Sequence, residues 1–483
     1  DTSYRLTEVG GGVGGQVRVM QGYQPIASAA PKAESRRDVG RIELSAVNGM
    51  RFFATFSLVC GRAIENLWID KGEEGRLFSH TICSGLHTLG KDVVSFYFIL
   101  SGFTMCWGYL GRDFNTDEVR WRYWTRRFAR FYPDFFLSTV ITFLLKLPYF
   151  FGCHNVGWQS WASNGTSLLL FTAWYRFVPG SGYVNGPVWF IVTLFWLWVF
   201  FPYLLKPVKT VFAKCSWGDF LMKLGLLWLV SLLPWAIIDK TNLQALRWGL
   251  RCFPVLRIPE FVIGMAIAIR VNKDKQEMDE MESKGEQPRC RPGVVAGVGP
   301  IIALILAGSY YLWKLSIWPD DCACLPGDMG ESFYHCFGWW EKFDTKFVPI
   351  SALMIFSVTT LDVAAHRNDG QPTYDAAVPR VGQVGACIWW CLCLEPFVTL
   401  GKWGLPIFLW QSATSLITQV LLIDLGWGLE TRCAGHGLKF SFEYAGFYWG
   451  FHVFMAYFVA WLMNDDGLIG SLIHNAVKKI TPA

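Results

Sequence analysis

Five arginines within eleven residues form the part of this sequence best suited to chemistry, and aromatic residues separate them. A guanidinium group presents a planar fork of donors that matches two oxygens of a phosphate group. The cluster is typical of two roles: holding the phosphates of an activated group donor, or anchoring the protein in phospholipid headgroups, where aromatic residues also gather. The arginines are Arg120, Arg122, Arg126, Arg127 and Arg130.

Proton acceptors are a further requirement of group transfer, and the apolar segments contain few carboxylates that could serve. Glu65 follows Arg62 by three residues, so both lie on one face of a helix. This spacing favours an ion pair, with a role as general base as the alternative. Glu260 follows Arg257 at the same spacing inside an apolar segment, where a carboxylate faces the protein interior or water. An ion pair with Arg257 is the favoured interpretation for Glu260, and catalysis is the other.

Three histidines are further candidates, because an imidazole with a pKa near 6.5 suits general base catalysis. His80 and His87 precede an apolar segment, where histidines are commonly solvated. His452 lies within an apolar segment, where a polar side chain is costly and often functional, although packing with one hydrogen bond also accounts for it.

Six cysteines occur in the connections that we place on one side of a membrane. Three of them share one loop, and Cys-x-Cys is poor metal spacing, so disulfides or free thiols are favoured over zinc and no metal site is predicted. The pairing stays open among Cys83, Cys153, Cys322, Cys324, Cys336 and Cys433.

The elements that must position these residues are membrane spans. The chain has 483 residues, of which 52% are hydrophobic and 17% charged, whereas soluble domains carry about a quarter of charged residues. Runs of about 20 apolar residues are long enough to cross a bilayer as helices. The apolar stretch 386–394 is too short and is placed at the interface. The sequence predicts ten spans near 46–65, 92–110, 132–151, 186–205, 219–238, 252–269, 294–313, 348–365, 405–421 and 444–463.

Ten spans place both termini on the same side of the membrane. The segments on that side contain 26 Lys and Arg, against 12 on the other, so both termini are predicted to be cytoplasmic, or stromal or matrix-facing in an organelle. Residues 1–45 form a flexible tail, 46–463 the membrane domain and 464–483 a second tail. The charged loop 272–293 is predicted to be a solvated connector. Because the positive charge is divided among short loops, nucleic acid is not an expected partner.

Several short strings follow one another in an order and spacing that resemble the acyltransferase-3 family of multi-pass membrane proteins. They include Leu-Ser-Gly-Phe after a run of aromatic residues, the basic segment, and Asn-Gly-Pro-Val-Trp before the fourth span. The resemblance extends over about residues 46–463 and is formed by the strings at 48–54, 98–103, 126–133, 185–189, 256–265 and 400–410.

The resemblance implies an all-α polytopic bundle that moves an acyl group from cytoplasmic acyl-CoA, a co-substrate and not a bound cofactor, to a hydroxyl group. Four positions depart from the family pattern: Arg62 replaces the helix-one histidine, Leu194 a glutamate, Gln411 a histidine and Ser95 an aspartate. The residues implied for donor binding are Arg51, Ser101, Arg126, Arg127, Arg130, Tyr132 and Trp189.

Arg62 decides between two functions, because a guanidinium stays charged, has no acceptor and cannot take a proton from a nucleophile. The first interpretation is an enzyme that acylates a carbohydrate, lipid or small molecule and takes its general base from another position. The second is an inactive scaffold that binds lipids or membrane protein partners. An anion carrier is a third interpretation, but the sequence shows no repeated halves of the kind found in transporters.

Overall fold

A computed structural model describes most of the predicted membrane domain. All described residues belong to one compact unit, Ile42–Ala483. Residues 1–43 of the predicted tail and most of 464–483 lie outside the described residues, as do the predicted disulfide cysteines or their side chains. The described ranges are 44–65, 67–69, 84–153, 188–241, 250, 252–284, 291–316, 345–367, 380–424, 438–440, 442–464, 467, 469–472 and 475.

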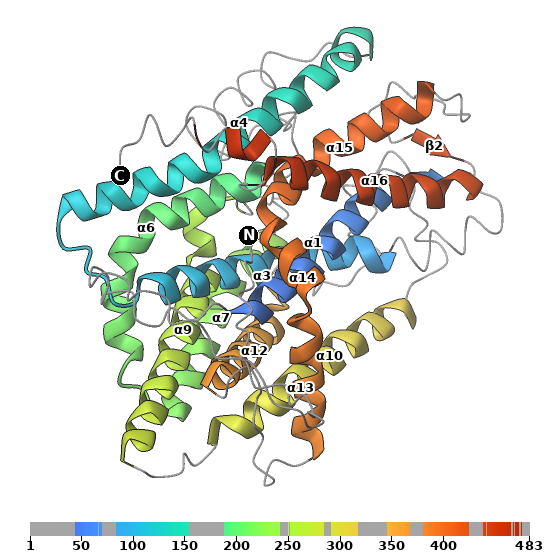
Figure 1. Cartoon of the computed structure of the whole chain (residues 1–483). Helices are drawn as coiled ribbons and strands as arrows, with labels where there is room; N and C mark the ends of the chain where they lie inside the picture. The colour runs from blue at the N-terminus through green and yellow to red at the C-terminus, as the bar shows by residue number, and fades with distance from the viewer. Residues whose placement is uncertain are drawn as a thin grey trace, which may run out of the picture. The chain divides into compact units, whose positions relative to one another are not determined.

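Each of the ten predicted spans coincides with a long helix, which confirms the all-α class (Figure 1). Two short helices, α13 (Arg380–Leu392) and α14 (Glu395–Lys402), precede the ninth. Two three-residue strands, β1 (Leu67–Ile69) and β2 (Leu438–Phe440), pair in parallel. The ten long helices are α1 (Ser45–Glu65), α3 (Ser84–Tyr109), α4 (Asp117–Cys153), α6 (Val188–Phe212), α7 (Trp217–Thr241), α9 (Pro254–Ser283), α10 (Arg291–Ser316), α12 (Val348–Arg367), α15 (Gly404–Asp424) and α16 (Phe442–Met463).

Several helices have the length and apolar surface of membrane spans. Within the described residues, four meet the requirements of length and hydropathy alone, in α4, α6, α7 and α12, and α3, α10 and α16 have shorter apolar stretches. The outward side chains are also apolar, as lipid contact requires. On α7 the exposed residues include Leu221, Met222, Leu226, Leu229 and Leu233.

Two helices extend further than their apolar runs. α4 has 37 residues, about 55 Å of helix against a hydrocarbon core of about 30 Å, so its basic first turns lie outside the core. Ion pairs of Arg120 with Asp117 and of Arg122 with Glu118 accompany these turns. α9 likewise continues to Ser283, which corrects the predicted connector 272–293 over its first part. Polar residues do not end a helix when pairs spaced four apart, such as Arg270 and Asp274 at 2.6 Å, support it.

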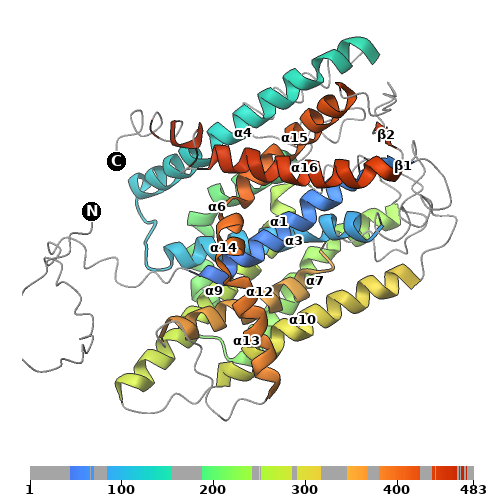
Figure 2. The same ribbon diagram turned by 45° about the vertical axis from the view of Figure 1, so that its right-hand side comes forward.

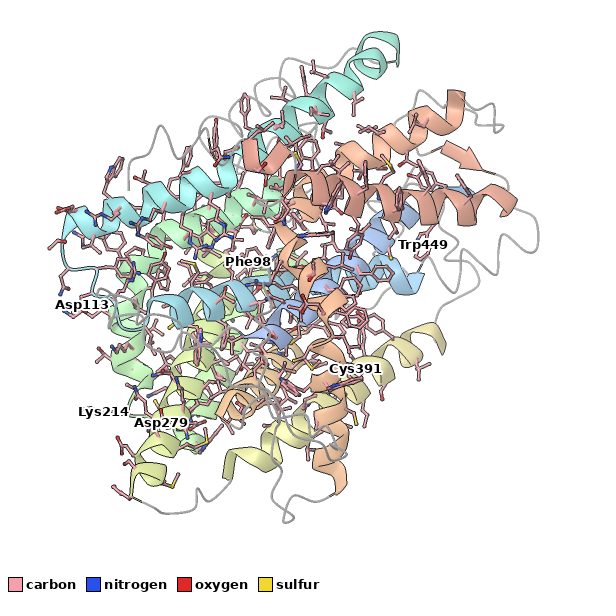
Figure 3. All side chains as sticks on the ribbon, viewed as in Figure 1. Phe98, Asp113, Lys214, Asp279, Cys391 and Trp449 are labelled. Atoms are coloured by element: carbon pink, nitrogen blue, oxygen red, sulfur yellow. The ribbon has the colours of Figure 1, made fainter. Side chains whose placement is uncertain are left out.

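Contacts between helix ends show that the long helices alternate in direction. At the end where α1 begins, here called the near end, Lys209 Nζ of α6 donates to the Leu110 carbonyl after α3 at 3.3 Å. At the far end, Thr193 Oγ1 of α6 donates to the Cys252 carbonyl before α9 at 2.9 Å, and β1 pairs with β2. In Figure 3 the labels of Lys214 and of Trp449 lie on opposite sides of the bundle.

α13 does not run from one end of the bundle to the other. A Cβ atom on Gly385 would collide with the carbonyl of Gly297, early in α10, and one on Gly49, early in α1, would collide with that of Leu392. α14 packs against α1, because a Cβ atom on Gly401 would collide with the carbonyl of Asn48, and α15 starts beside α1, because a Cβ atom on Gly404 would lie 3.0 Å from Thr55 Oγ1. Both ends of α13 therefore lie near the near end, beside α12 and α10 (Figure 2). This agrees with the prediction that 386–394 does not cross.

Glycines allow the central helices to approach closely. A Cβ atom on Gly102 of α3 would collide with the Phe261 carbonyl of α9, and one on Gly264 of α9 would collide with the Ile99 carbonyl of α3. Small residues at crossings let membrane helices pack backbone to backbone. The Leu-Ser-Gly-Phe string is thus a packing element, with Phe98 and Phe103 fully buried around the crossing.

Candidate active site

Arg51 lies on the inner part of α1, near the start of the helix, and its neighbours are polar. Its Nη1 donates to Asn48 Oδ1 at 3.0 Å. Its carbonyl accepts hydrogen bonds from Thr55 Oγ1 at 2.7 Å and from Tyr97 of α3 at 3.2 Å. The hydroxyl groups of Thr55 and Tyr97 also bond to each other. α1 and α3 are therefore joined by polar contacts at the level of this arginine.

The basic segment of α4 lies near Arg51 of α1. The positive charges of Arg127 and Arg130 lie close enough to act on the charge of Arg51. These like charges repel one another, with Arg51 and Arg127 partly buried and Arg130 exposed. An anion bound among them would remove this repulsion. The structure therefore brings together three of the residues that the sequence assigned to donor binding.

Arg127 is oriented by an aromatic residue that sequence reasoning missed. Its guanidinium lies 5.7 Å from the ring centroid of Trp198 in α6 and 6.0 Å from that of Tyr109. The Trp198 indole nitrogen donates to Ser101 Oγ at 3.0 Å. Ser101 is thus linked to the arginines through Trp198. A buried indole N–H usually has an acceptor, but the sequence of α6 alone does not say which of its tryptophans contacts the basic segment.

The remaining candidates for donor binding are placed elsewhere. Arg126 is exposed on α4. Tyr132 stacks on Phe128, with ring centroids 4.5 Å apart, and on Phe136. Trp189 contacts Phe190 at the start of α6, about 14 Å along the helix from Trp198. In the contacts that the structure describes, Tyr132 and Trp189 pack against aromatic neighbours on their own helices, and Arg126 lies on the surface of α4.

The candidate proton acceptors are only partly described. Positions 62 and 65 belong to α1 and position 87 to α3, but the side chains of Arg62, Glu65 and His87 lie outside the described residues, and so does His80. Position 62 falls on the same face of α1 as Arg51, because eleven residues make close to three helical turns. The predicted pairing of Arg62 with Glu65 stays a prediction.

Glu260 forms the predicted ion pair. Its Oε1 lies 2.7 Å from Arg257 Nη1, and the two side chains are 0% and 1% exposed. The guanidinium also lies 5.4 Å from the ring centroids of Phe98 and Trp235. The pair is near the start of α9, against Phe98, the residue of α3 that follows the Tyr97 bonded to the Arg51 carbonyl. Its geometry supports the structural interpretation over the catalytic one.

Of the four positions that depart from the family pattern, the three whose side chains are described, Ser95, Leu194 and Gln411, are buried. Leu194 is packed in the main apolar cluster. Gln411 is 2% exposed, and its Oε1 has no hydrogen-bond partner within the described part of the chain; the neighbouring Trp410 Nε1 is in the same situation. Burying polar atoms without a partner is costly.

Asp362 of α12 is a buried carboxylate that sequence analysis did not single out. Its Oδ2 accepts the backbone N–H of Ala46 at 2.9 Å, and its Oδ1 accepts the Trp389 indole at 2.8 Å. A negative charge at the first turn of α1 stabilises the helix start. Burial, and next the charge of Asp362, raise the pKa of the Cys393 thiol, which therefore stays protonated beside the carboxylate. Asp362 thus fixes the start of α1 and with it the position of Arg51.

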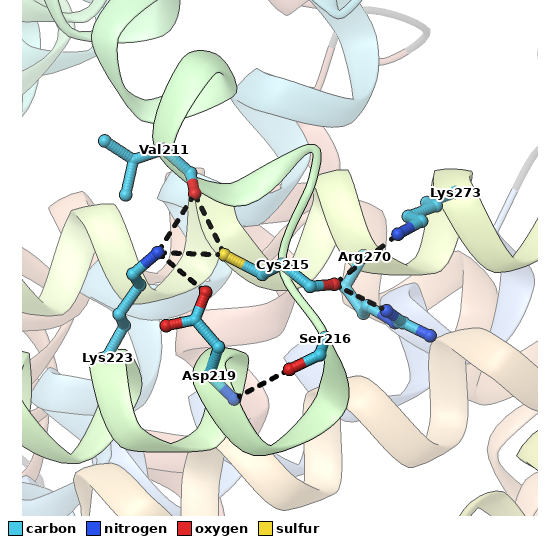
Figure 4. A network of polar contacts seen from close by, with 7 residues as sticks. All are labelled: Val211, Cys215, Ser216, Asp219, Lys223, Arg270 and Lys273. Carbon is cyan, nitrogen blue, oxygen red and sulfur yellow. Dashed lines mark hydrogen bonds and ion pairs between the residues drawn. The ribbon is translucent and has the colours of Figure 1, made fainter.

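A second polar network joins α6, α7 and α9 at the near end (Figure 4). Lys223 Nζ lies 2.9 Å from Asp219 Oδ2 and 3.1 Å from Cys215 Sγ, and Arg270 Nη1 donates to the Cys215 carbonyl at 3.4 Å. Burial raises the pKa of Asp274 although Arg270 opposes this shift. The network holds the α6–α7 turn against α9. Among the described residues no group of three or more His, Cys, Asp or Glu could hold a metal ion.

Comparison with known proteins places the bundle in a family. A family model described as an acyltransferase domain (Acyl_transf_3) matches residues 44–464. The chain belongs to the acyltransferase-3 family. It is also 25% identical over 280 residues to the acyltransferase MdmB of Streptomyces mycarofaciens, a match that covers 56% of this chain and 63% of the relative. No solved structure matches the chain. Membership of the acyltransferase-3 family agrees with the resemblance inferred from the short strings.

Proposed function

We propose that this protein is a membrane acyltransferase that transfers a short acyl group from acyl-CoA to a hydroxyl group of a carbohydrate, lipid or small molecule. The observation that supports it best is the approach of Arg127 and Arg130 of α4 to Arg51 of α1. Coenzyme A carries several phosphate groups, and arginine is the side chain that matches phosphate oxygens in pairs. Family membership supplies the reaction class.

The position of Arg51 favours a bound donor over lipid headgroups as the anion of this cluster. Arg122, Arg126 and Arg130 are exposed on α4, as a headgroup anchor requires. Arg51 instead belongs to a helix that packs against α3, α14 and α15, and its side chain is partly buried beside Asn48. A phosphate that meets Arg51 must therefore enter between helices, which suits a soluble donor reaching in from the near end.

The alternative is a scaffold without activity, which binds lipids or other membrane proteins. Leu194 supports it, because an apolar side chain packed in the core has replaced the glutamate of the family pattern. The two functions differ in whether the arginine cluster binds an acyl donor. For either function we propose that both termini face the cytoplasm, or the stroma or matrix of an organelle.

Donor binding is the first test. Millimolar acetyl-CoA is expected to raise the melting temperature of the detergent-solubilised protein, since a ligand bound only to the folded state stabilises it. Arg127→Ala and Arg130→Ala should each weaken binding about 10-fold or more, the effect of losing one charge-assisted hydrogen bond. Arg122→Ala, an exposed arginine of the same helix, should bind like the wild type. Absence of any stabilisation by acetyl-CoA would favour the scaffold.

A further inference from the structure

We propose that His452 of α16 is the proton acceptor of this acyl transfer, in place of the histidine that position 62 lacks. The inference rests on the proposed function and names the base that the reaction needs. His452 is 0% exposed in the interior of the bundle, and its ring stacks on that of Tyr448 with centroids 6.1 Å apart and planes 7° apart. An ionisable side chain inside a membrane bundle is a functional candidate by default.

The register between α15 and α16 places His452 opposite Gln411. These helices are antiparallel: Ser415 Oγ lies 3.2 Å from the Tyr448 hydroxyl, and Ile407 packs in one cluster with Ala456. From the first contact to the second, the residue number falls by eight in α15 and rises by eight in α16. Gln411 and His452 are the midpoints of the two intervals and so share one level.

The register between α1 and α15 places position 62 at this same level. α1 runs in the same direction as α15, with Val59 in the cluster of Ile407 and Ala456. One turn beyond Val59 is position 62, and one turn beyond Ile407 is Gln411. Position 62 of α1, Gln411 of α15 and His452 of α16 therefore lie at one height in the bundle. The family pattern has histidines at the first two positions, whereas here the histidine comes from α16.

Polar groups connect this level to the arginine cluster. The Tyr457 hydroxyl of α16 has no hydrogen-bond partner among the described residues. Tyr457 lies near Cys60 of α1 and Tyr97 of α3, and Tyr97 bonds to Thr55 and to the Arg51 carbonyl. A row of hydroxyl groups thus runs from Arg51 along α1 towards the level of His452. Such a row supplies hydrogen-bonding groups along this face of α1 in an otherwise apolar core.

The spacing of the two levels fits a coenzyme A thioester. Eleven residues of helix separate Arg51 from position 62, about 16 Å along the axis. In coenzyme A a long flexible arm separates the phosphate groups from the sulfur. Phosphates held by Arg51, Arg127 and Arg130 would therefore leave the arm directed along α1, with the thioester at the level of His452.

The chemistry then balances without a further reagent. The neutral imidazole of His452 takes the proton of the acceptor hydroxyl as its oxygen attacks the thioester carbonyl. The new C–O bond gives a tetrahedral oxyanion at the former carbonyl carbon. The C–S bond breaks as the intermediate collapses. The imidazolium returns the proton to the leaving thiolate, so the products are the acyl ester and free coenzyme A.

Hydrolysis of acetyl-CoA, followed by release of the free thiol, tests the assignment with water as acceptor. His452→Gln is expected to lower the rate about 100-fold or more, the contribution of a positioned general base, while acetyl-CoA still stabilises the protein against heat. Tyr448→Phe is the matched control, because it keeps the ring stacked beside position 452 and should retain most of the rate. Adding Arg62→His to His452→Gln should recover at least a 10-fold part of the loss, since position 62 shares the level of His452.

The outcomes separate this proposal from the proposed function. Turnover that is unchanged in His452→Gln, or in His452→Asn if the glutamine variant does not fold, overturns the role of His452. A wild-type protein that binds acetyl-CoA but does not turn it over also overturns it and leaves donor binding intact. Failure of the wild type to bind acetyl-CoA instead removes the proposed acyl transfer itself.

Discussion

The role of a charged residue in this bundle depends on which group it contacts. The sequence predicted correctly that Glu260 pairs with Arg257, because both lie on one helix three residues apart. It also grouped Arg51 with the basic segment, through the family resemblance. It missed Trp198 and Asp362, whose partners Arg127 and Ala46 come from other helices. Spacing within a helix reveals partners on that helix, whereas partners across an interface depend on how the helices pack.

Removing one charge of the buried pair should be costly. Glu260→Ala leaves the Arg257 guanidinium buried without its carboxylate and is expected to destabilise the fold by about 3–5 kcal/mol. The measurement is denaturant or thermal unfolding of the solubilised protein. Arg257→Leu combined with Glu260→Leu should lose much less, because no isolated charge remains. Loss of activity with unchanged stability in Glu260→Ala would contradict the structural role and favour catalysis.

Whole helices are predicted in position more accurately than in length. Apolar runs located all ten, because lipid demands a continuous apolar stretch. They placed the start of the third span at 132, although α4 begins at Asp117, and ended the sixth at 269, although α9 continues to Ser283. Hydropathy marks where lipid ends, while backbone hydrogen bonds and charge pairs decide where the helix ends. The crossing of α3 and α9 was not predicted, since a glycine signals a close approach but not its partner.

The α3–α9 crossing provides a matched pair of glycine substitutions. Gly264→Ala should destabilise the protein by at least about 1–3 kcal/mol, because its Cβ would meet the backbone of Ile99 and the helices would have to separate. Gly225→Ala on α7, where nothing lies within 4 Å of an added Cβ, should be neutral or slightly stabilising. Unfolding in detergent compares the two variants. Equal stability would mean that α3 and α9 are less close than described.

At the scale of the whole molecule, charge and contacts give one consistent arrangement. The count of Lys and Arg assigned alternate connections to opposite sides. The bonds from Lys209 to Leu110 and from Thr193 to Cys252 join ends that this count places together. The direction of α15 depends on whether α13 crosses, and the contacts of Gly385 and Gly401 place both ends of α13 near the start of α1. The sequence predicted that the long helices alternate in direction, but hydropathy alone did not decide whether α13 crosses the membrane.

Thiol labelling can test this arrangement in intact membranes. Cys391 is exposed on α13, and Lys214 is exposed in the α6–α7 turn at the near end. In intact cells a membrane-impermeant maleimide should leave Cys391 and the variant Lys214→Cys unmodified, and should label both once the membrane is opened, with peptide mapping to identify each site. The reason is that a 13-residue helix, about 20 Å long, does not span a hydrocarbon core of about 30 Å. Labelling of the two sites from opposite sides would show that α13 crosses and would reverse α15 and α16, and the alignment of His452 with position 62 would then be lost.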